Sequence, residues 1–398
     1  MDSPTPVRPA LTNTVAPLAY HTAVVDYLRC HEPEVWRWAS ERTTDAGQRE
    51  ALRAALLRGT YRIEPEAHPE VHAHLATAMA RLGIDAPATL YQMPGQEMNA
   101  ALYYVAGEVH IVVQGPLFER MTADELRAVF GHELAHYLLW SRDDGSLFVA
   151  DRILHDAVVT GQASNSQRET WRRYALHTEL FADRGGALAA DAVAPAVAAL
   201  VKVETGIGTV DASAYLRQAA EIESNETGAS AAHTHPETFL RARALAHWWN
   251  GAPDLEAWLE KRLLGPLVLE RLDLPGQARV QALTRGFLAH YLAGTALASD
   301  AVLAQLRSMF PDWRDDEPVL DPMQFDAADA SVHAYLNALM LDLALRDPDQ
   351  QDAALLRAGE VATTLGSLDG LMLHLRRDAG FGKRELDRYK RRLAKEST

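Results

Sequence analysis

The stretch from residue 122 to residue 141, TADELRAVFGHELAHYLLWS, contains three residues whose types and spacing suit hydrolytic chemistry. His132 and His136 are four positions apart, so on an α-helix their imidazoles point the same way and can bind one metal ion. Glu133 lies about 100° further round the helix, beside the metal, where it can take a proton from a water that the metal holds. The HExxH pattern therefore indicates metal-assisted hydrolysis.

The same stretch carries the pattern of an amphipathic helix that begins after Thr122. Thr122 and Glu125 have the spacing of a capping box. Apolar residues then recur at steps of three and four, namely Leu126, Val129, Phe130, Leu134 and Leu138. We therefore expect a helix with one buried face, which would hold both histidines in register.

Short patterns such as HExxH also occur by chance, so a working site needs a third ligand. A second helix is predicted to open with Ser166 and Glu169 as a capping box and to continue through WRRYALHTELFADRGGA. Glu179 and Asp183 share one face of this helix, so Glu179 could reach the metal while Asp183 accepts a hydrogen bond from a ligand imidazole. The competing candidates for the third ligand are Glu169, Glu204 and His177.

Two neutral histidines and one carboxylate would leave a Zn²⁺ site with a net positive charge and an open fourth position. Such a site lowers the pKa of a bound water to about 7. We therefore expect one Zn²⁺ per chain.

Residues 99–115, NAALYYVAGEVHIVVQG, contain two β-rich runs around Ala106, Gly107 and Glu108, which predicts a hairpin. The second run, Val109 to Gln114, comes just before the helix with the histidines. An edge strand here can pair with an extended peptide through main-chain hydrogen bonds, and an ordinary interior hairpin is the alternative. On the first interpretation the substrate contacts Asn99, Val109, Ile111 and Val113.

The composition excludes several classes of protein. The 398-residue chain carries a formal net charge of -15, which argues against a nucleic-acid partner and against electrostatic binding to an anionic membrane. Cys30 is the single cysteine, so neither an intramolecular disulfide nor a thiolate-rich zinc site is possible, and a reducing compartment is favoured. Because no apolar stretch is long enough to span a bilayer, we expect a cytoplasmic protein without a membrane span.

The organisation along the chain predicts an α+β fold that is mostly α-helical. Residues 1–17 are Pro-rich and are expected to form a flexible leader, and residues 18–67 a helical segment. Residues 68–250 hold the hairpin and both predicted metal-site helices. Residues 251–398 have helical periodicity without metal-ligand spacing, so we expect a helical domain that regulates the protein or binds a protein partner.

Residues of about 68–250 resemble the M48 family of zinc metallopeptidases. The matching pieces come in family order: Asn99-Ala100 before a hairpin, Gly115 after the strand, DELRAVFGHELAH, ELFADRGGA, a helix ending AALVKV, and THPETFLRARAL. The resemblance implies a zincin-like core in which His132, His136 and Glu179 bind zinc, Glu133 is the general base and acid, and Asp183 supports a ligand. The chain departs from the best-known members in lacking their transmembrane helices.

The segment THPETFLRARAL adds His235 and Arg241, which match the His-Pro pair of the family and the Arg that follows it. His235 could donate to the oxyanion of a tetrahedral intermediate, or occupy the open zinc position and hold the enzyme inactive. Arg241 could position substrate, or fix its loop through a carboxylate such as Asp183. The simpler alternative for His235 is that it caps the helix that follows.

The function expected from these patterns is that of a zinc endopeptidase acting on a peptide or protein substrate. Zinc would polarise the scissile carbonyl, and Glu133 would deprotonate the attacking water and then protonate the leaving amine. Two alternative functions would use the same residues. One is a partner-binding protein with a structural or autoinhibited zinc site, and the other is zinc-dependent hydrolysis of a non-peptide substrate.

Overall fold

The computed structural model describes residues 15–43, 46–225, 228–232, 235–314, 316–319 and 329–396. The chain divides into two compact units, unit 1 (Met1–Gly265) and unit 2 (Pro266–Thr398). The boundary expected after residue 250 falls between two helices that both belong to unit 1. Most of the expected leader, residues 1–14, lies outside the described residues.

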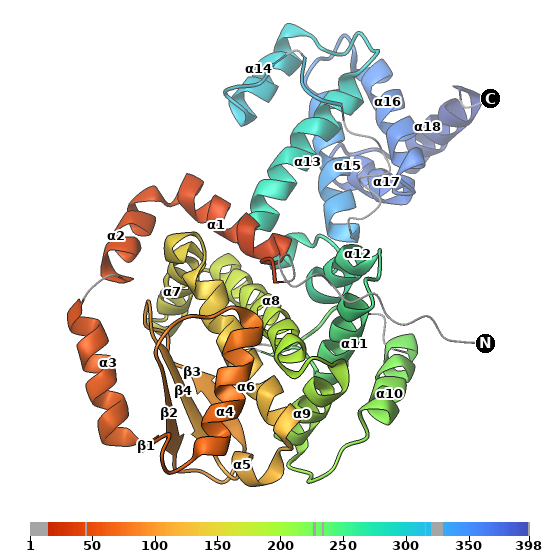
Figure 1. The fold of residues 1–398 in the computed structure, drawn as a ribbon. Coiled ribbons are helices and arrows are strands. Elements are labelled where there is room, and N and C mark those ends of the chain that lie inside the picture. Colours follow the sequence, from red (N-terminus) through yellow and green to blue (C-terminus); the bar gives the residue numbers. More distant parts are fainter. Residues whose placement is uncertain are drawn as a thin grey trace. The chain divides into compact units, whose positions relative to one another are not determined.

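Unit 1 is an α+β fold in which helices surround one small sheet, as expected (Figure 1). Its elements are α1 (Ala19–His31), α2 (Pro33–Thr43), α3 (Ala46–Gly59), β1 (Tyr61–Ile63), α4 (Pro69–Leu82), β2 (Ala88–Met93), β3 (Asn99–Leu102), β4 (Val109–Gln114), α5 (Leu117–Arg120), α6 (Ala123–Ser141), η1 (Asp143–Gly145), α7 (Ser146–Val159), α8 (Asn165–Ala190), α9 (Val193–Thr205), α10 (Ala212–Asn225), α11 (Thr238–Trp249), α12 (Leu255–Leu259) and the π-helical turn η2 (Glu260–Leu264).

The sheet has four strands in the order β1-β2-β4-β3. β1 runs antiparallel to β2, β2 runs parallel to β4, and β3 runs antiparallel to β4. The hairpin predicted around Gly107 is confirmed as β3–β4, and Gly107 has a φ of 83°, which is unfavourable for residues with a side chain. β3 is therefore one edge of the sheet, and β4 is an interior strand.

This strand order corrects the prediction that substrate contacts the second run of the hairpin. β4 pairs on both sides, so none of its main chain is left to pair with a peptide. The side chains of Val109, Ile111 and Val113 are fully buried in the core of unit 1. The edge strand next to the histidine helix is β3, the first run of the hairpin.

The helix that carries the histidines, α6, begins where the sequence predicted. The Thr122 hydroxyl accepts from the amide of Glu125, and the Glu125 carboxylate accepts from the amide of Thr122, which confirms the capping box. The Glu125 carboxylate also accepts from Lys202 Nζ of α9 at 2.7 Å, a buried ion pair. Capping and ion pair together fix the start of α6 against α9.

The second metal-site helix, α8, begins two residues earlier than predicted. Its capping box consists of Ser164 and Gln167 rather than Ser166 and Glu169. Glu169 instead accepts hydrogen bonds from Arg172 and Arg173, at 2.7 and 2.8 Å. Both pairs of residues satisfy the capping spacing, so the pattern alone did not distinguish them.

α6 and α8 cross closely because glycines lie at the contact. A Cβ on Gly131 of α6 would lie 2.6 Å from the carbonyl oxygen of Gly185, and a Cβ on Gly185 would lie 2.7 Å from the carbonyl oxygen of Gly131. No side chain fits in that space, so glycine at both positions lets the two backbones approach each other. This contact brings Glu179 of α8 near the histidines of α6.

Unit 2 consists of helices with their own core. Its elements are η3 (Leu269–Arg271), α13 (Leu274–Leu292), α14 (Asp300–Met309), α15 (Ala330–Ala344), α16 (Gln351–Thr364), α17 (Leu368–Arg377) and α18 (Lys383–Glu396). Its core includes Phe287, Tyr291, Leu336, Met340 and Leu371. Residues 320–328, before α15, lie outside the described residues.

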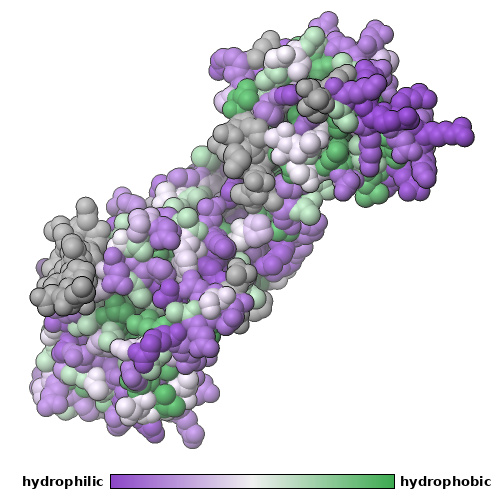
Figure 2. Space-filling model, turned by 90° about the vertical axis from the view of Figure 1, so that its right-hand side faces the viewer, coloured by the Kyte–Doolittle hydropathy of each residue, from purple (hydrophilic) through white to green (hydrophobic). Residues whose placement is uncertain are grey.

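Many charged side chains are exposed. In the basic C-terminal helix α18, Tyr389 and Leu393 are buried and most of the charged side chains are exposed. Figure 2 shows one face of the molecule, on which hydrophilic side chains dominate and hydrophobic ones form small groups. Among the described residues, no helix combines the length and the apolar character that crossing a bilayer requires.

Candidate metal centre

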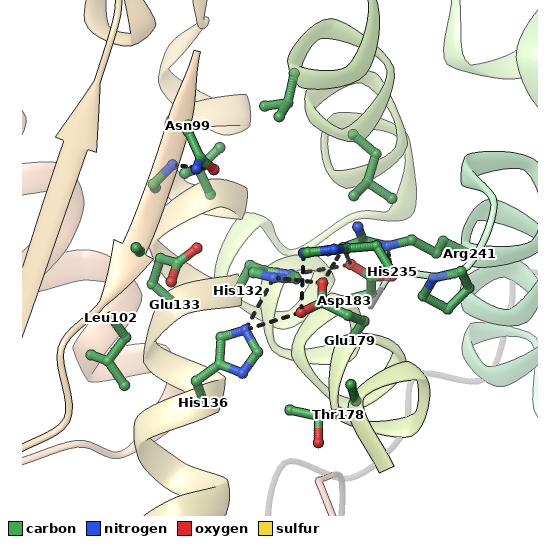
Figure 3. A pocket seen from close by; sticks show the side chains of 18 of the residues that line it. Asn99, Leu102, His132, Glu133, His136, Thr178, Glu179, Asp183, His235 and Arg241 are labelled. Atoms are coloured by element: carbon green, nitrogen blue, oxygen red, sulfur yellow. Dashed lines mark hydrogen bonds and ion pairs between the residues drawn. The ribbon is translucent and has the colours of Figure 1, made fainter. Parts of the chain in front are cut away.

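Three side chains from α6 and α8 converge on one point in unit 1 (Figure 3). Nε2 of His132 lies 3.3 Å from Nε2 of His136 and 3.5 Å from Oε2 of Glu179. Nε2 of His136 lies 3.8 Å from Oε1 of Glu179, and the three donor atoms all fall within 4.8 Å of one another. Two imidazole nitrogens and a carboxylate oxygen form a donor set that suits a divalent cation such as Zn²⁺.

Asp183 and Arg241 hold this group in place. Oδ1 of Asp183 lies 3.1 Å from Nδ1 of His132, and this hydrogen bond turns the opposite nitrogen of the ring, Nε2, toward the centre. Arg241 of α11 donates to both carboxylate oxygens of Asp183, at 2.8 and 2.6 Å, and its Nη2 lies 3.2 Å from Glu179. Asp183 thus contacts His132 on one side and Arg241 on the other.

The charges at the centre set unequal proton affinities for the two histidines. Burial acts to lower the pKa of His132, but the hydrogen bonds and charges of Asp183 and Glu179 outweigh it and raise the pKa to about 10. Burial lowers the pKa of His136 to about 4. Without a metal, His132 therefore carries a proton at neutral pH and His136 does not.

The third donor, Glu179, is ionised at neutral pH. Burial alone would raise the pKa of Glu179, but Arg241 and the two histidines outweigh it and hold the pKa well below its usual range. A buried carboxylate kept negative by a neighbouring guanidinium is available to a cation without losing a proton first.

Glu133 lies beside the three donors, between α6 and β3, as Figure 3 shows. Its side chain is buried, and the backbone amide of Leu102 hydrogen-bonds to its carboxylate. Burial raises the pKa of Glu133 to about 7. A carboxyl group with this pKa can both take up and give back a proton near neutral pH.

His235 lies at the mouth of the site, in the segment that leads into α11. Its Nε2 is 3.7 Å from Oε1 of Glu179, and 62% of its side chain is exposed. It is not among the three donors that lie within 4.8 Å of one another. Glu237, and not His235, is the N-cap residue of α11, so the capping role considered for His235 is wrong.

The centre opens into a cavity of about 630 Å³. One wall is the edge strand β3, from which Asn99 to Leu102 line the cavity. The other walls come from α6, α7, α8 and α9, and from His235, Pro236, Thr238 and Arg241. Of the four residues expected to contact substrate, Asn99 lines this cavity, whereas the three valine and isoleucine residues of β4 do not.

The competing ligand candidates lie elsewhere or have other partners. His177 donates from Nδ1 to the carbonyl oxygen of Arg173 at 2.6 Å, and its ring stacks on Tyr20 at 4.5 Å between centroids. Glu169 is paired with two arginines of its own helix. Glu204 of α9 lines the cavity but is exposed and does not belong to the three-donor group.

Sequence reasoning missed the residues of α7 that face the cavity, Asp151 and His155, and the flanking Trp140 and Trp171. Asp151 and His155 are four residues apart on α7 and therefore share a face of that helix. Nothing in the sequence placed that face next to the histidines, because the packing of α7 against α8 depends on tertiary contacts.

Comparison with known proteins agrees with this geometry. Residues 65–145 match peptidase family M48, and this segment includes both histidines and Glu133 and ends before Glu179. Plastoglobule-localized metallopeptidase 48, chloroplastic, of Arabidopsis thaliana is 28% identical over 198 residues, which are 45% of this chain and 56% of the relative. The match thus spans little more than half of that relative's length, and no solved structure matches. Residues 65–145, which carry the histidine helix, are thus similar to peptidase family M48, and a longer stretch of the chain is similar to a metallopeptidase.

Proposed function

We propose that the protein is a zinc-dependent endopeptidase that binds its peptide substrate in extended form along β3. The observation that carries the proposal is the convergence of His132, His136 and Glu179 on one point beside the buried carboxyl group of Glu133. The cavity supports a peptide substrate, because its wall is an edge strand whose outer side is unpaired among the described strands.

The metal would be held by the two Nε2 atoms and the Glu179 carboxylate, and when bound it supplies a Lewis acid that polarises water and the scissile carbonyl. Glu133 accepts the proton of the attacking water at its carboxylate and passes it to the nitrogen of the leaving amine. Its pKa of about 7 suits both steps. His235, exposed at the mouth, donates a hydrogen bond to the developing oxyanion.

The test is the variant Glu133→Gln, assayed on casein and on a peptide library with and without a chelator. Glutamine keeps the size and the hydrogen-bonding capacity of the side chain but cannot take up a proton. We expect cleavage to fall by at least about a hundredfold, because proton transfer contributes at this scale. Bound metal, measured by elemental analysis, should stay at one per chain.

The matched control is Glu119→Gln, which makes the same change on α5, outside the cavity lining, and should leave cleavage unchanged. Wild-type cleavage by Glu133→Gln would contradict the mechanism. A wild-type protein that binds one zinc and cleaves none of these substrates would instead support the partner-binding alternative.

A further inference from the structure

Beyond the metal ligands, the cavity is lined by residues of three helices. Trp140 of α6, Asp151 and His155 of α7, and Trp171 and Ala175 of α8 line it, and we call these five residues the acidic arm. The acidic arm adjoins the metal centre along α6 and along α8. The ring of His136 stacks on that of Trp140 with centroids 5.3 Å apart, and Ala175 lies one turn before Glu179.

Asp151 is the feature of this arm that points to a ligand. Its side chain is half-buried in the cavity wall, and it makes no hydrogen bond or ion pair with any residue that the structure describes. The two nearby basic side chains, His155 and Arg152, act on Asp151 only through space, because each lies against Asp156 instead, at 3.6 and 3.2 Å. Burial raises the pKa of Asp151 to about 6, so the carboxylate is formed at neutral pH at some cost in solvation.

The other cavity carboxylates near the centre have partners. Glu179 and Asp183 are held by Arg241 and His132, and Glu133 is bonded by the amide of Leu102. A partly desolvated carboxylate without a partner is stabilised when a cation binds to it. Asp151 is thus better placed than these three carboxylates to bind a cationic group from outside the chain.

The walls around Asp151 fit a long cationic side chain. The indoles of Trp140 and Trp171 are partly exposed, and aromatic rings bind both the methylene stem and the charge of lysine or arginine. The part of the cavity lined by α9 differs, because it is formed mainly by Ala196, Ala199, Leu200 and Val203. The two ends of the cavity therefore differ in the side chains that they accommodate.

We propose that the acidic arm binds a lysine or arginine side chain of the substrate next to the scissile bond, so that the protein selects basic cleavage sites. This inference rests on the proposed peptidase function and adds a substrate class to it. Asp151 is a specificity residue and takes no part in bond cleavage, and the β3 edge binds main chain without regard to sequence.

The first test maps cleavage sites in a peptide library with the wild type and with Asp151→Asn. The wild type should show lysine and arginine enriched at one fixed position beside the cleaved bond. For a matched pair of peptides with lysine or norleucine there, kcat/KM should favour lysine by about ten- to a hundredfold, the value of a hydrogen bond to a charged group. Asp151→Asn should lose this preference while cleaving the norleucine peptide as the wild type does.

Two further variants test whether the preference depends on the charge of residue 151, and not on a loss of stability or on any carboxylate in the cavity. Asp151→Lys should shift the preference from lysine to glutamate, which a merely destabilised protein would not do. Glu204→Gln removes a carboxylate from the other end of the same cavity and should keep the lysine preference. A wild type without basic enrichment, or an Asp151→Asn profile identical to the wild type, would overturn the proposal.

A binding measurement keeps this inference separate from the peptidase proposal. The zinc-loaded Glu133→Gln variant is titrated with the same two peptides, so no turnover is needed. Tighter binding of the lysine peptide, abolished by adding Asp151→Asn, supports the acidic arm even if the wild type cleaves nothing. Equal affinity for both peptides contradicts it even if the wild type is an active peptidase.

Discussion

His132 is the residue at which a proton and a metal ion compete. Its Nδ1 is bonded to Asp183, so the proton lost on metal binding is the one on Nε2. Because its pKa without metal is raised to about 10, the ring is protonated at every lower pH. Metal affinity should therefore rise with pH by about tenfold per unit between about pH 7 and about pH 9, as expected when one proton is released.

Isothermal titration of the metal-free protein with Zn²⁺ in buffers of different ionisation enthalpy would count this proton. At pH 7 we expect close to one proton from His132 and none from His136, whose pKa is lowered to about 4. Asp183→Asn removes one of the interactions that raise the pKa of His132, so the number released should fall. Binding of Zn²⁺ without proton release by the wild type would show that His132 is not a ligand.

At the scale of residues, spacing along a helix was enough to pair His132 with His136 and Glu179 with Asp183. This works because helical geometry is local, and residues four apart share a face in any context. Whether two such faces meet depends on tertiary packing. In the sequence, that packing was indicated by the order of the family motifs. The unpaired carboxylate of Asp151 could not be foreseen, since the absence of a partner is a property of the folded structure.

At the scale of elements, the contact between α6 and α8 determines whether the donors meet. Gly185→Ala places a methyl group 2.7 Å from the carbonyl oxygen of Gly131, so the helices must move apart. Overpacking of this kind costs about 1–3 kcal/mol, and displacement of Glu179 from the histidines should weaken metal binding as well. Urea unfolding followed by a zinc titration measures both effects.

The control for this substitution is Gly59→Ala at the end of α3, where an added Cβ meets no atom within 4 Å. It should leave both the stability and the zinc affinity within error of the wild type. If Gly185→Ala were as stable as the wild type and bound zinc equally well, the close crossing would not be what assembles the centre.

The strands show where sequence reasoning was limited. The hairpin was predicted correctly because its turn residues are local, but the edge was assigned to the wrong strand. β1, which was not predicted, pairs with β2, and β2 pairs with the free side of β4, which makes β4 an interior strand. The run VHIVV offered a hint, because a strand without alternation of polar and apolar residues is typically buried on both faces.

At the scale of the whole molecule, the chain has two compact units with separate cores. All residues of the candidate centre belong to unit 1. The helical character of residues 251–398 follows from their periodicity, whereas their role does not, because no group of residues there has the spacing of a catalytic or metal site. A regulatory or partner-binding role for residues 251–398 stays a prediction.

Separate cores predict that metal binding stabilises one unit and not the other. At a zinc concentration of a hundred times Kd, unit 1 should gain about 2.7 kcal/mol, or roughly 5–10 °C in its unfolding temperature. Calorimetry of the full chain with zinc and with a chelator should show one transition that shifts and one that does not. In His136→Ala the chelator should shift neither, because a ligand is lost. A single transition that moves as a whole would show instead that the two units unfold together, and the metal site would then control the stability of the entire chain.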